Sequence, residues 1–351
     1  MIKVGIAGTA KNTGKTTFAS KLINELEIND VRIGITSIGY DGEELDTVTG
    51  LPKPKYQLPE NVIVATTSFA LKNVSTKVKI LKEYADIKTA LGNLLLLKTL
   101  SRGNIILAGP STAATLNRVL EDMKYYGVEF AIVDGAFNRM APFSIMDGVV
   151  IATGLSRSRN IQYLSLEVKT LERIFTLPAA TLSLQGMSCG AYYIDKDNKI
   201  IKISFGHFLT RDIFSTIRNN KLSPGGTLVF NTFVPISSIT HLVNQIKPQN
   251  IIFKDPISLL LSGEVHEIYN ILQVIERKGI SLYVLKPIKL ICIAVNPCGI
   301  YLKEGSYKKE CMSPTELLES LRKEVKNTPI VDVIFEDIKI YEIVKKRLRV
   351  K

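Results

Sequence analysis

The sequence predicts an α/β protein built on a doubly wound, mostly parallel sheet, followed by a second α/β half that contains a β-hairpin. In the first half, short runs rich in β-branched residues alternate with amphipathic runs at helical spacing. That alternation is typical of parallel strands joined by helices. In the second half, residues 190–203 alternate around Asp-Lys-Asp-Asn, a hairpin pattern, before further strand and helix runs. We therefore expect a first domain over residues 1–177 and a second α/β region over residues 178–351.

The chain begins with a strand, a glycine-containing loop and a helix in direct succession. Residues 3–7 form the expected strand, and apolar residues at helical spacing from Phe18 to Leu26 predict the helix. The loop between them ends in Gly14-Lys15-Thr16, as a phosphate-binding loop requires. An ordinary turn at a helix cap is the alternative, and both flanks disfavour it. The residues expected to bind nucleotide are Gly8, Thr9, Asn12, Thr13, Gly14, Lys15, Thr16 and Thr17.

Each part of this loop has a distinct expected role. The backbone N–H groups and the positive helix N-terminus bind phosphate oxygens, and Lys15 reaches the β- and γ-phosphates. The Thr16 hydroxyl is expected to ligate Mg²⁺. ATP is the expected nucleotide, with GTP as the alternative.

Two aspartates are predicted to lie on the metal side of the same site. Asp134 follows the apolar run 130–133, and Asp41 follows the strand expected over 31–38. Ligands of doubly wound sheets meet the carboxyl ends of the strands. We therefore expect Thr16, Asp41 and Asp134 to contact Mg²⁺, and Lys15 and Asp41 to act in catalysis. A solvated turn is the alternative for Asp41.

Composition excludes several classes of protein. With 46% hydrophobic and 22% charged residues, the chain is an ordinary globular protein. Neither a membrane span nor a signal peptide is recognisable, so a cytoplasmic location is expected. The net charge of +12 comes from Lys and Arg spread along the chain, which favours a solvated surface over nucleic-acid binding. The four cysteines lack metal-ligand spacing, and we expect free thiols rather than disulfides.

Further expectations concern individual segments. Helical spacing predicts a helix from Ser68 to Tyr84, and an apolar run predicts a buried strand from Asn104 to Ala108. The loop over residues 39–54 is expected to change between ATP and ADP states. In the second half, Asn231 stands at a predicted strand end.

The loop spacing resembles that of dethiobiotin synthetases, cobyrinic-acid-diamide synthetases and molybdenum-cofactor guanine-nucleotide adaptors. The resemblance covers residues 8–17, Asp134-Gly135-Ala136 and the segment from Leu155 to Asn160. It departs at Asp134, where those families more usually have Glu. No segment matches their substrate-carboxylate residues. The resemblance also implies that a strand-end Asn, here Asn231, contacts the nucleobase.

Residues 5–17, 36–43 and 51–54 together resemble the KamB family, the P-loop subunits of lysine 5,6-aminomutase reactivases in anaerobic lysine-fermenting bacteria. This resemblance implies an ATP-driven accessory protein. Its implied partners are a MutS-like ATPase subunit and an aminomutase that depends on adenosylcobalamin and pyridoxal phosphate. The implied work is the exchange of damaged cobalamin.

Three functions follow from these observations. The first is an NTPase with slow intrinsic turnover that acts on a partner. The second is an ATP-dependent ligase that activates a carboxylate, and the third is a nucleotide-binding adaptor without catalysis. The sequence leaves open whether two copies form a homodimer.

Overall fold

The computed structural model describes residues 1–39, 56–89, 91–182, 188–205, 222, 224–303 and 306–349. The chain divides into two compact units, Met1–Ser165 with Lys289–Lys351, and Leu166–Ile288. This division differs from the expected boundary at residue 177. The C-terminal segment returns to the first unit, because β15 (Lys289–Asn296) pairs in parallel with β9 (Gly148–Gly154).

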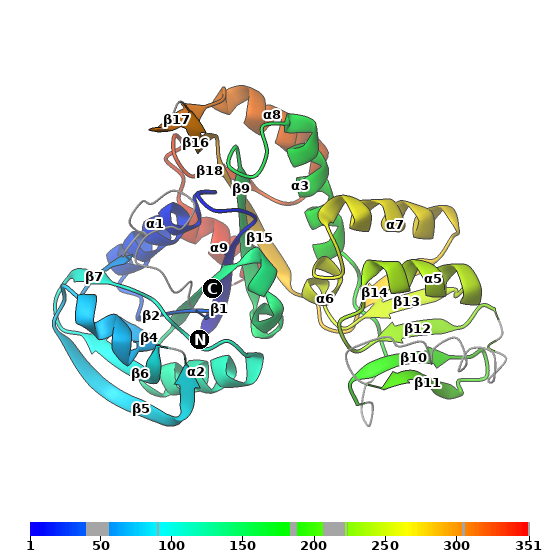
Figure 1. Ribbon diagram of the computed structural model, residues 1–351, viewed down its shortest axis with the longest axis horizontal. Coiled ribbons are helices and arrows are strands. Elements are labelled where there is room, and N and C mark those ends of the chain that lie inside the picture. Colours follow the sequence, from blue (N-terminus) through cyan, green and yellow to red (C-terminus); the bar gives the residue numbers. More distant parts are fainter. Residues whose placement is uncertain are drawn as a thin grey trace. The chain divides into compact units, whose positions relative to one another are not determined.

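The first unit contains a nine-stranded sheet with the order β18-β15-β9-β1-β8-β2-β4-β6-β5 (Figure 1). Its pairs are parallel from β18 to β4, whereas β6 and β5 are antiparallel. The remaining strands of this sheet are β1 (Ile2–Gly8), β2 (Ile33–Ser37), β4 (Ile63–Thr67), β5 (Val78–Thr89), β6 (Gly92–Thr99), β8 (Phe130–Ala136) and β18 (Ile330–Asp332). The expected α/β class with a mostly parallel sheet is thereby confirmed.

Two small antiparallel ribbons and a set of helices complete this unit. The ribbons are β3 (Tyr56–Leu58) with β7 (Gly103–Ile105), and β16 (Cys298–Lys303) with β17 (Ser306–Cys311). The helices are α1 (Lys15–Ile28), α2 (Ala113–Tyr125), α8 (Pro314–Glu324), α9 (Ile340–Leu348) and the start of α3 (Ile161–Phe175), with 3-10 turns η1 (Ser68–Asn73), η2 (Phe137–Arg139) and η3 (Ala141–Ile145). The strand expected to reach Ala108 ends at Ile105.

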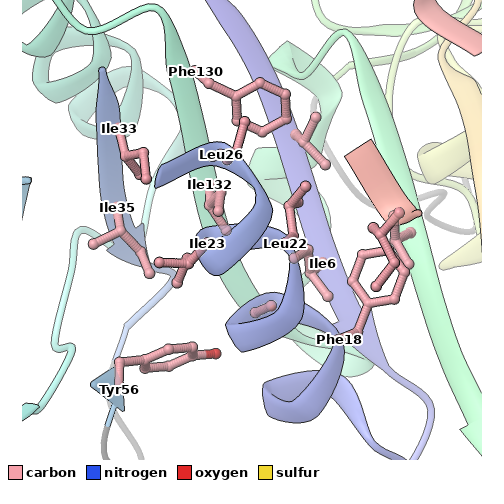
Figure 2. Packing of buried hydrophobic residues seen from close by; sticks show 14 of the residues in the cluster. Ile6, Phe18, Leu22, Ile23, Leu26, Ile33, Ile35, Tyr56, Phe130 and Ile132 are labelled. Carbon is pink, nitrogen blue, oxygen red and sulfur yellow. The ribbon is translucent and has the colours of Figure 1, made fainter. Parts of the chain in front are cut away.

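The main core lies between one face of the sheet and helix α1. Phe18, Leu22 and Leu26 of α1 are fully buried against the strands, and Figure 2 shows them beside Ile6 and Ile132. Alternation along β2 sends Ile33 and Ile35 to this face. Gly34 faces the other way, where an added Cβ would lie 2.9 Å from Val128 and 3.0 Å from Met123 at the end of α2. The two faces of the sheet are thus covered by different helices.

On the second face, the ring of Phe143 lies on two glycines of the central strands. A Cβ added at Gly5 of β1 or at Gly135 of β8 would come within 2.9 Å of that ring. Phe143 itself is fully buried. These glycines therefore allow an aromatic side chain to lie directly on the sheet backbone, next to the strand ends that form the site.

Phe143→Ala is expected to lower the free energy of unfolding by about 3–5 kcal/mol, because it leaves a ring-sized cavity that the backbone of two strands cannot close. Denaturant unfolding of the full chain measures the change. The matched control is Phe335→Ala, since Phe335 is 58% exposed, and we expect a change within about 0.5 kcal/mol. Equal losses for both variants would contradict this description of the core.

The helix predicted from Ser68 to Tyr84 is wrong. A short 3-10 turn, η1, occupies its start, and β5 occupies its end. The pairing of β5 with β6 is irregular between Tyr84 and Lys88. This irregularity places Tyr84 and Ile87, three residues apart, both in buried positions. Within the predicted segment itself, the pairing of β5 with β6 shifts register between Ile80 and Lys82, so the side chains of this strand do not alternate strictly.

The second unit is a smaller α/β layer with a five-stranded sheet of order β11-β10-β12-β13-β14. Its elements are β10 (Gly190–Ile194), β11 (Ile200–Phe205), β12 (Thr227–Phe230), α5 (Ile236–Ile246), β13 (Asn250–Phe253), α6 (Pro256–Leu260), α7 (Val265–Arg277) and β14 (Ser281–Val284), preceded by most of α3. The hairpin predicted over 190–203 is confirmed as β10–β11. Strands β12, β13 and β14 are parallel neighbours in chain order.

In the part of the chain that the structure describes, no helix combines the length and apolar character that a membrane crossing needs.

Candidate functional site

The candidate site is the loop between β1 and α1, which lies where β1, β8 and β9 end. Two of its residues have positive φ, Asn12 at 60° and Gly14 at 88°. Gly14 is required there, because an added Cβ would also lie 2.6 Å from Val333 and 3.2 Å from the Cβ of Asn296. This left-handed turn leads the chain directly into the first turn of α1.

The loop is held by its own hydrogen bonds and by the neighbouring strand β9. The Thr13 hydroxyl is buried and donates to the Ala10 carbonyl at 3.0 Å. The Thr9 N–H donates to the Ala152 carbonyl at 2.9 Å, and the Thr9 hydroxyl donates to Thr153 at 3.1 Å. Gly8 leaves room for this arrangement, since an added Cβ would lie 2.7 Å from the Thr13 hydroxyl. These hydrogen bonds fix the course of the loop backbone against β9.

The N-terminus of α1 is open to an anion. Its N-cap residue, Gly14, provides no side-chain cap, and the first turn contains no acidic residue. The first N–H groups of a helix lack partners within the helix and carry a partial positive charge. Thr16 and Thr17 lie in this turn, with Thr17 exposed. This end of α1 can thus accept a negatively charged group.

Lys15 and Asp134, predicted from separate motifs, are brought into contact. The Lys15 ammonium lies 2.8 Å from Oδ1 of Asp134 and donates to the Gly135 carbonyl at 3.1 Å. Their side chains are 26% and 14% exposed, so the ion pair is largely sheltered from solvent. Asp134 lies at the carboxyl end of β8, which pairs with β1. The lysine is therefore neutralised by a carboxylate in the described structure.

Tyr56 is a residue of the site that the sequence reasoning missed. Its hydroxyl is buried and lies near the Thr16 and Asp134 side chains. Burial, and then the negative charge of Asp134, raise the pKa of Tyr56 well above its usual value, so the phenol stays neutral. In Figure 2 its oxygen points toward α1.

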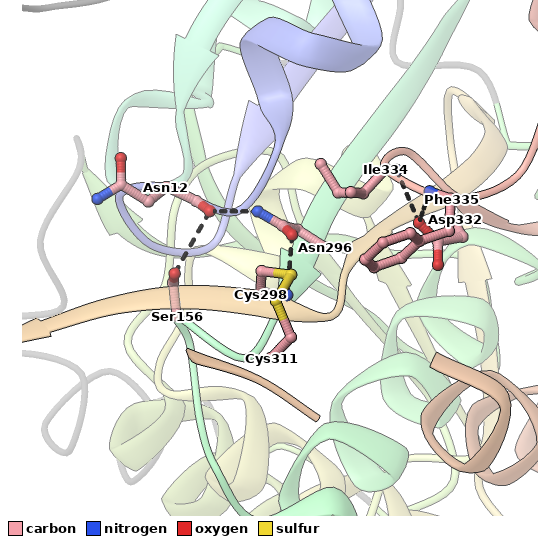
Figure 3. The surroundings of a disulfide bond; sticks show 8 residues. All are labelled: Asn12, Ser156, Asn296, Cys298, Cys311, Asp332, Ile334 and Phe335. Carbon is pink, nitrogen blue, oxygen red and sulfur yellow. Dashed lines mark hydrogen bonds between the residues drawn. A yellow bond between two sulfur atoms is a disulfide. The ribbon is translucent and has the colours of Figure 1, made fainter. Parts of the chain in front are cut away.

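Asn296 is a second residue that was missed, at the carboxyl end of β15. Its Nδ2 donates to the Asn12 carbonyl of the loop at 2.9 Å, while its Oδ1 accepts from the Cys298 N–H at 2.9 Å (Figure 3). The Ser156 hydroxyl donates to the same Asn12 carbonyl at 3.3 Å. Gly154 lets β9 and β15 meet here because it has no side chain: an added Cβ would lie 2.0 Å from the Asn296 carbonyl oxygen.

The expectation of free thiols is wrong for two of the four cysteines. Cys298 and Cys311 form a disulfide between directly opposed residues of β16 and β17. In the sequence, the two cysteines are placed symmetrically about the dipeptide Glu304-Gly305, and this spacing was the sequence signal for the pair. The remaining cysteines, Cys189 and Cys292, are not disulfide-bonded.

Opening this disulfide is expected to lower the free energy of unfolding by about 2–4 kcal/mol, because the bridge restricts a short loop of the unfolded chain. Thermal unfolding with and without a dithiol reductant measures the effect. The matched control is the double variant Cys298→Ser/Cys311→Ser, whose unfolding temperature should not respond to the reductant. An unchanged unfolding temperature in the unaltered protein, with both thiols shown to be free, would contradict the expectation.

The structure does not bring all predicted site residues together in its described part. Gly8, Thr9, Asn12, Thr13, Gly14, Lys15, Thr16 and Thr17 form the loop and the first turn of α1, with Asp134 beside Lys15. Asp41 and the loop over 40–54 lie outside the described residues. Asn231 belongs to the second unit, where its side chain donates to the Ser188 carbonyl at 3.2 Å.

No group of three or more His, Cys, Asp or Glu side chains within the described ranges could hold a metal ion alone. Mg²⁺ is commonly held by one or two carboxylates together with substrate phosphates. Asp134 provides such a carboxylate, and its Oδ1 has the Lys15 ion pair but no hydrogen bond. Asp134 would therefore hold Mg²⁺ together with further oxygen ligands, phosphate among them.

Comparison with models of known protein families gave no match, and comparison with curated proteins gave no match either.

Proposed function

We propose that residues 8–17 bind a magnesium-bound nucleoside triphosphate and that the protein is a P-loop NTPase with slow turnover. The observation that supports this most strongly is the contact between Lys15 and Asp134 at 2.8 Å. A phosphate-contacting lysine at the start of a helix and a metal-side aspartate at the end of the adjacent strand are the groups that this chemistry needs. ATP is the proposed nucleotide, with GTP as the alternative.

The loop fits a triphosphate chain in charge and in shape. Its left-handed residues, Asn12 and Gly14, turn the backbone before the uncapped N-terminus of α1. Backbone N–H groups in such a turn form a concave site for anions. Lys15 provides one full positive charge beside it. Because Asp134 neutralises this charge in the described structure, phosphate binding requires Lys15 to exchange one anionic partner for another.

The same exchange prepares the metal side of the site. With Lys15 on the phosphates, Oδ1 of Asp134 would hold Mg²⁺ or one of its water ligands. Thr16 supplies a hydroxyl from the first turn of α1, as proposed from the sequence, and the neutral phenol of Tyr56 lies near both groups. Bound Mg²⁺ would neutralise charge on the transferred phosphoryl group. Lys15 would stabilise the same charge from the other side.

The biological role that we propose is that of an accessory subunit which reactivates a cobalamin-dependent aminomutase together with a MutS-like ATPase. Support for this role is the resemblance of residues 5–17, 36–43 and 51–54 to the KamB family. Within this proposal the protein acts in the cytoplasm, and Asp41 and the loop around it transmit the nucleotide state to the partner.

The experiment that tests the proposal is phosphate release by the purified full chain, alone and with an aminomutase and its MutS-like subunit. We expect slow, Mg²⁺-dependent release that rises when the partners are added, together with recovery of an inactivated aminomutase. Phosphate release that depends strictly on a small carboxylic acid would indicate that the protein is a carboxylate-activating ligase instead. Nucleotide binding with no phosphate release under any condition would indicate that the protein is a nucleotide-binding adaptor without catalysis.

A further inference from the structure

The Asn296 carboxamide has both of its polar ends engaged. Nδ2 donates to the Asn12 carbonyl at 2.9 Å, and Oδ1 accepts from the Cys298 N–H at 2.9 Å. The amide therefore connects the phosphate loop to the start of the β16–β17 hairpin, as Figure 3 shows. Both bonds have ordinary length for an N–H donor and a carbonyl-type acceptor.

The carbonyl that Asn296 holds belongs to a residue in an unusual conformation. Asn12 has φ of 60°, which is uncommon for a residue with a side chain. A hydrogen bond to its carbonyl fixes the orientation of the peptide unit that follows, and hence the direction of the Thr13 N–H. The Cβ of Asn296 would also lie 3.2 Å from a Cβ at Gly14, so the same residue limits the loop sterically.

The other end of the connection is firmly anchored. The disulfide closes the base of the β16–β17 hairpin at Cys298. The Tyr301 hydroxyl of β16 donates to the Leu155 carbonyl, and Glu310, next to Cys311 in β17, pairs with Arg159 at 2.8 Å. The Arg159 guanidinium also lies 3.9 Å from the centre of the Tyr301 ring. These contacts hold the hairpin against the segment that follows β9.

We propose that Asn296 is a positioning residue of the nucleotide site, which holds the phosphate loop in its binding conformation before the ligand arrives. This inference rests on the proposed function of residues 8–17. A preformed loop binds more tightly because less conformational entropy is lost on binding. Because the loop contacts the phosphate chain, the gain in affinity should be the same for every ligand that contains such a chain.

The test compares Asn296→Ala with the unaltered full chain, using two magnesium-bound probes, ATP and inorganic tripolyphosphate. Both probes present a phosphate chain, and only ATP has a base and a ribose. Loss of one neutral hydrogen bond predicts weaker binding by about tenfold for both probes alike. Circular dichroism and thermal unfolding establish that the variant is folded.

The matched control is Asn29→Ala, which removes another carboxamide that donates to a backbone carbonyl, that of Glu25 at 2.7 Å, at the C-terminal end of α1 and not at the phosphate loop. It should leave both affinities unchanged. If Asn296→Ala does not fold, Asn296→Asp replaces it, because it keeps the acceptor for Cys298 and removes the donor to Asn12. We expect this variant to bind both probes more weakly by at least the same factor, since its carboxylate also repels phosphate.

Three results would overturn the inference. Unchanged affinity for both probes would mean that Asn296 does not position the loop. Weaker ATP binding with unchanged tripolyphosphate binding would assign Asn296 to the base or the ribose. If the unaltered protein binds neither probe, the proposed function itself fails, and that outcome is distinct from the first two because it needs no variant.

Discussion

Lys15→Ala is expected to weaken the binding of magnesium-ATP by about 10- to 150-fold, because it removes a charged donor to the phosphates from a sheltered position. Titration calorimetry on the full chain measures the affinity. In the ligand-free protein the same change leaves Asp134 without its ion-pair partner, so a lower unfolding temperature is also expected. Both effects originate from one ammonium group.

The matched control for this variant is Lys21→Ala in the same helix. Lys21 donates to the Glu336 carbonyl at 3.2 Å instead of lying at the helix start, so ATP affinity should be unchanged. If Lys15→Ala binds ATP as tightly as the unaltered protein does, the phosphate chain lies elsewhere and the proposed site is wrong. A folded state for the variant, checked by circular dichroism, is needed for that conclusion.

Asp134→Asn is expected to act in opposite directions on two properties. Without Mg²⁺, nucleotide binding should become tighter, because Lys15 no longer has to leave a carboxylate to reach the phosphates. The strengthening of binding by Mg²⁺ should be lost, and phosphate release should fall by about 100- to 1000-fold, as when one electrostatic contact to a transition state is removed. Affinities with Mg²⁺ and with a chelator, and the rate of release, measure these effects.

Asp122→Asn is the matched control for this pair of effects. Asp122 also forms an ion pair with a lysine, Lys82, at 2.7 Å, but it lies on α2 and not at the phosphate loop. Neither the magnesium dependence nor the rate of release should change. If Asp134→Asn keeps the magnesium dependence of binding, Asp134 contacts neither Mg²⁺ nor its water ligands.

The parts of the site that depend on a local sequence pattern could be predicted from the sequence. The strand, loop and helix over residues 2–28 follow one another without interruption, and Asp134 stands directly after four buried strand residues. Parallel strands that end at the same edge of a sheet bring such residues together. The contact between Lys15 and Asp134 is therefore the expected consequence of the topology.

Residues that reach the site over long sequence distances could not be predicted. Asn296 contacts a loop 284 residues away, and this requires the C-terminal segment to return to the first unit. Tyr56 comes from the two-stranded ribbon β3–β7 and has no motif around it. The disulfide had a usable signal in its symmetric spacing. The expectation of free thiols rested on the absence of metal-ligand spacing and on the rarity of disulfides in reducing compartments.

The most direct measurement of the central claim is a crystal structure of the full chain with Mg²⁺ and a non-hydrolysable ATP analogue. The proposal predicts phosphate oxygens at hydrogen-bond distance from backbone N–H groups of residues 12–16, with the Lys15 ammonium moved from Asp134 to the β- and γ-phosphates. It also predicts Mg²⁺ between the phosphates, Thr16 and Asp134. Phosphates bound elsewhere, with the ion pair between Lys15 and Asp134 intact, would contradict it.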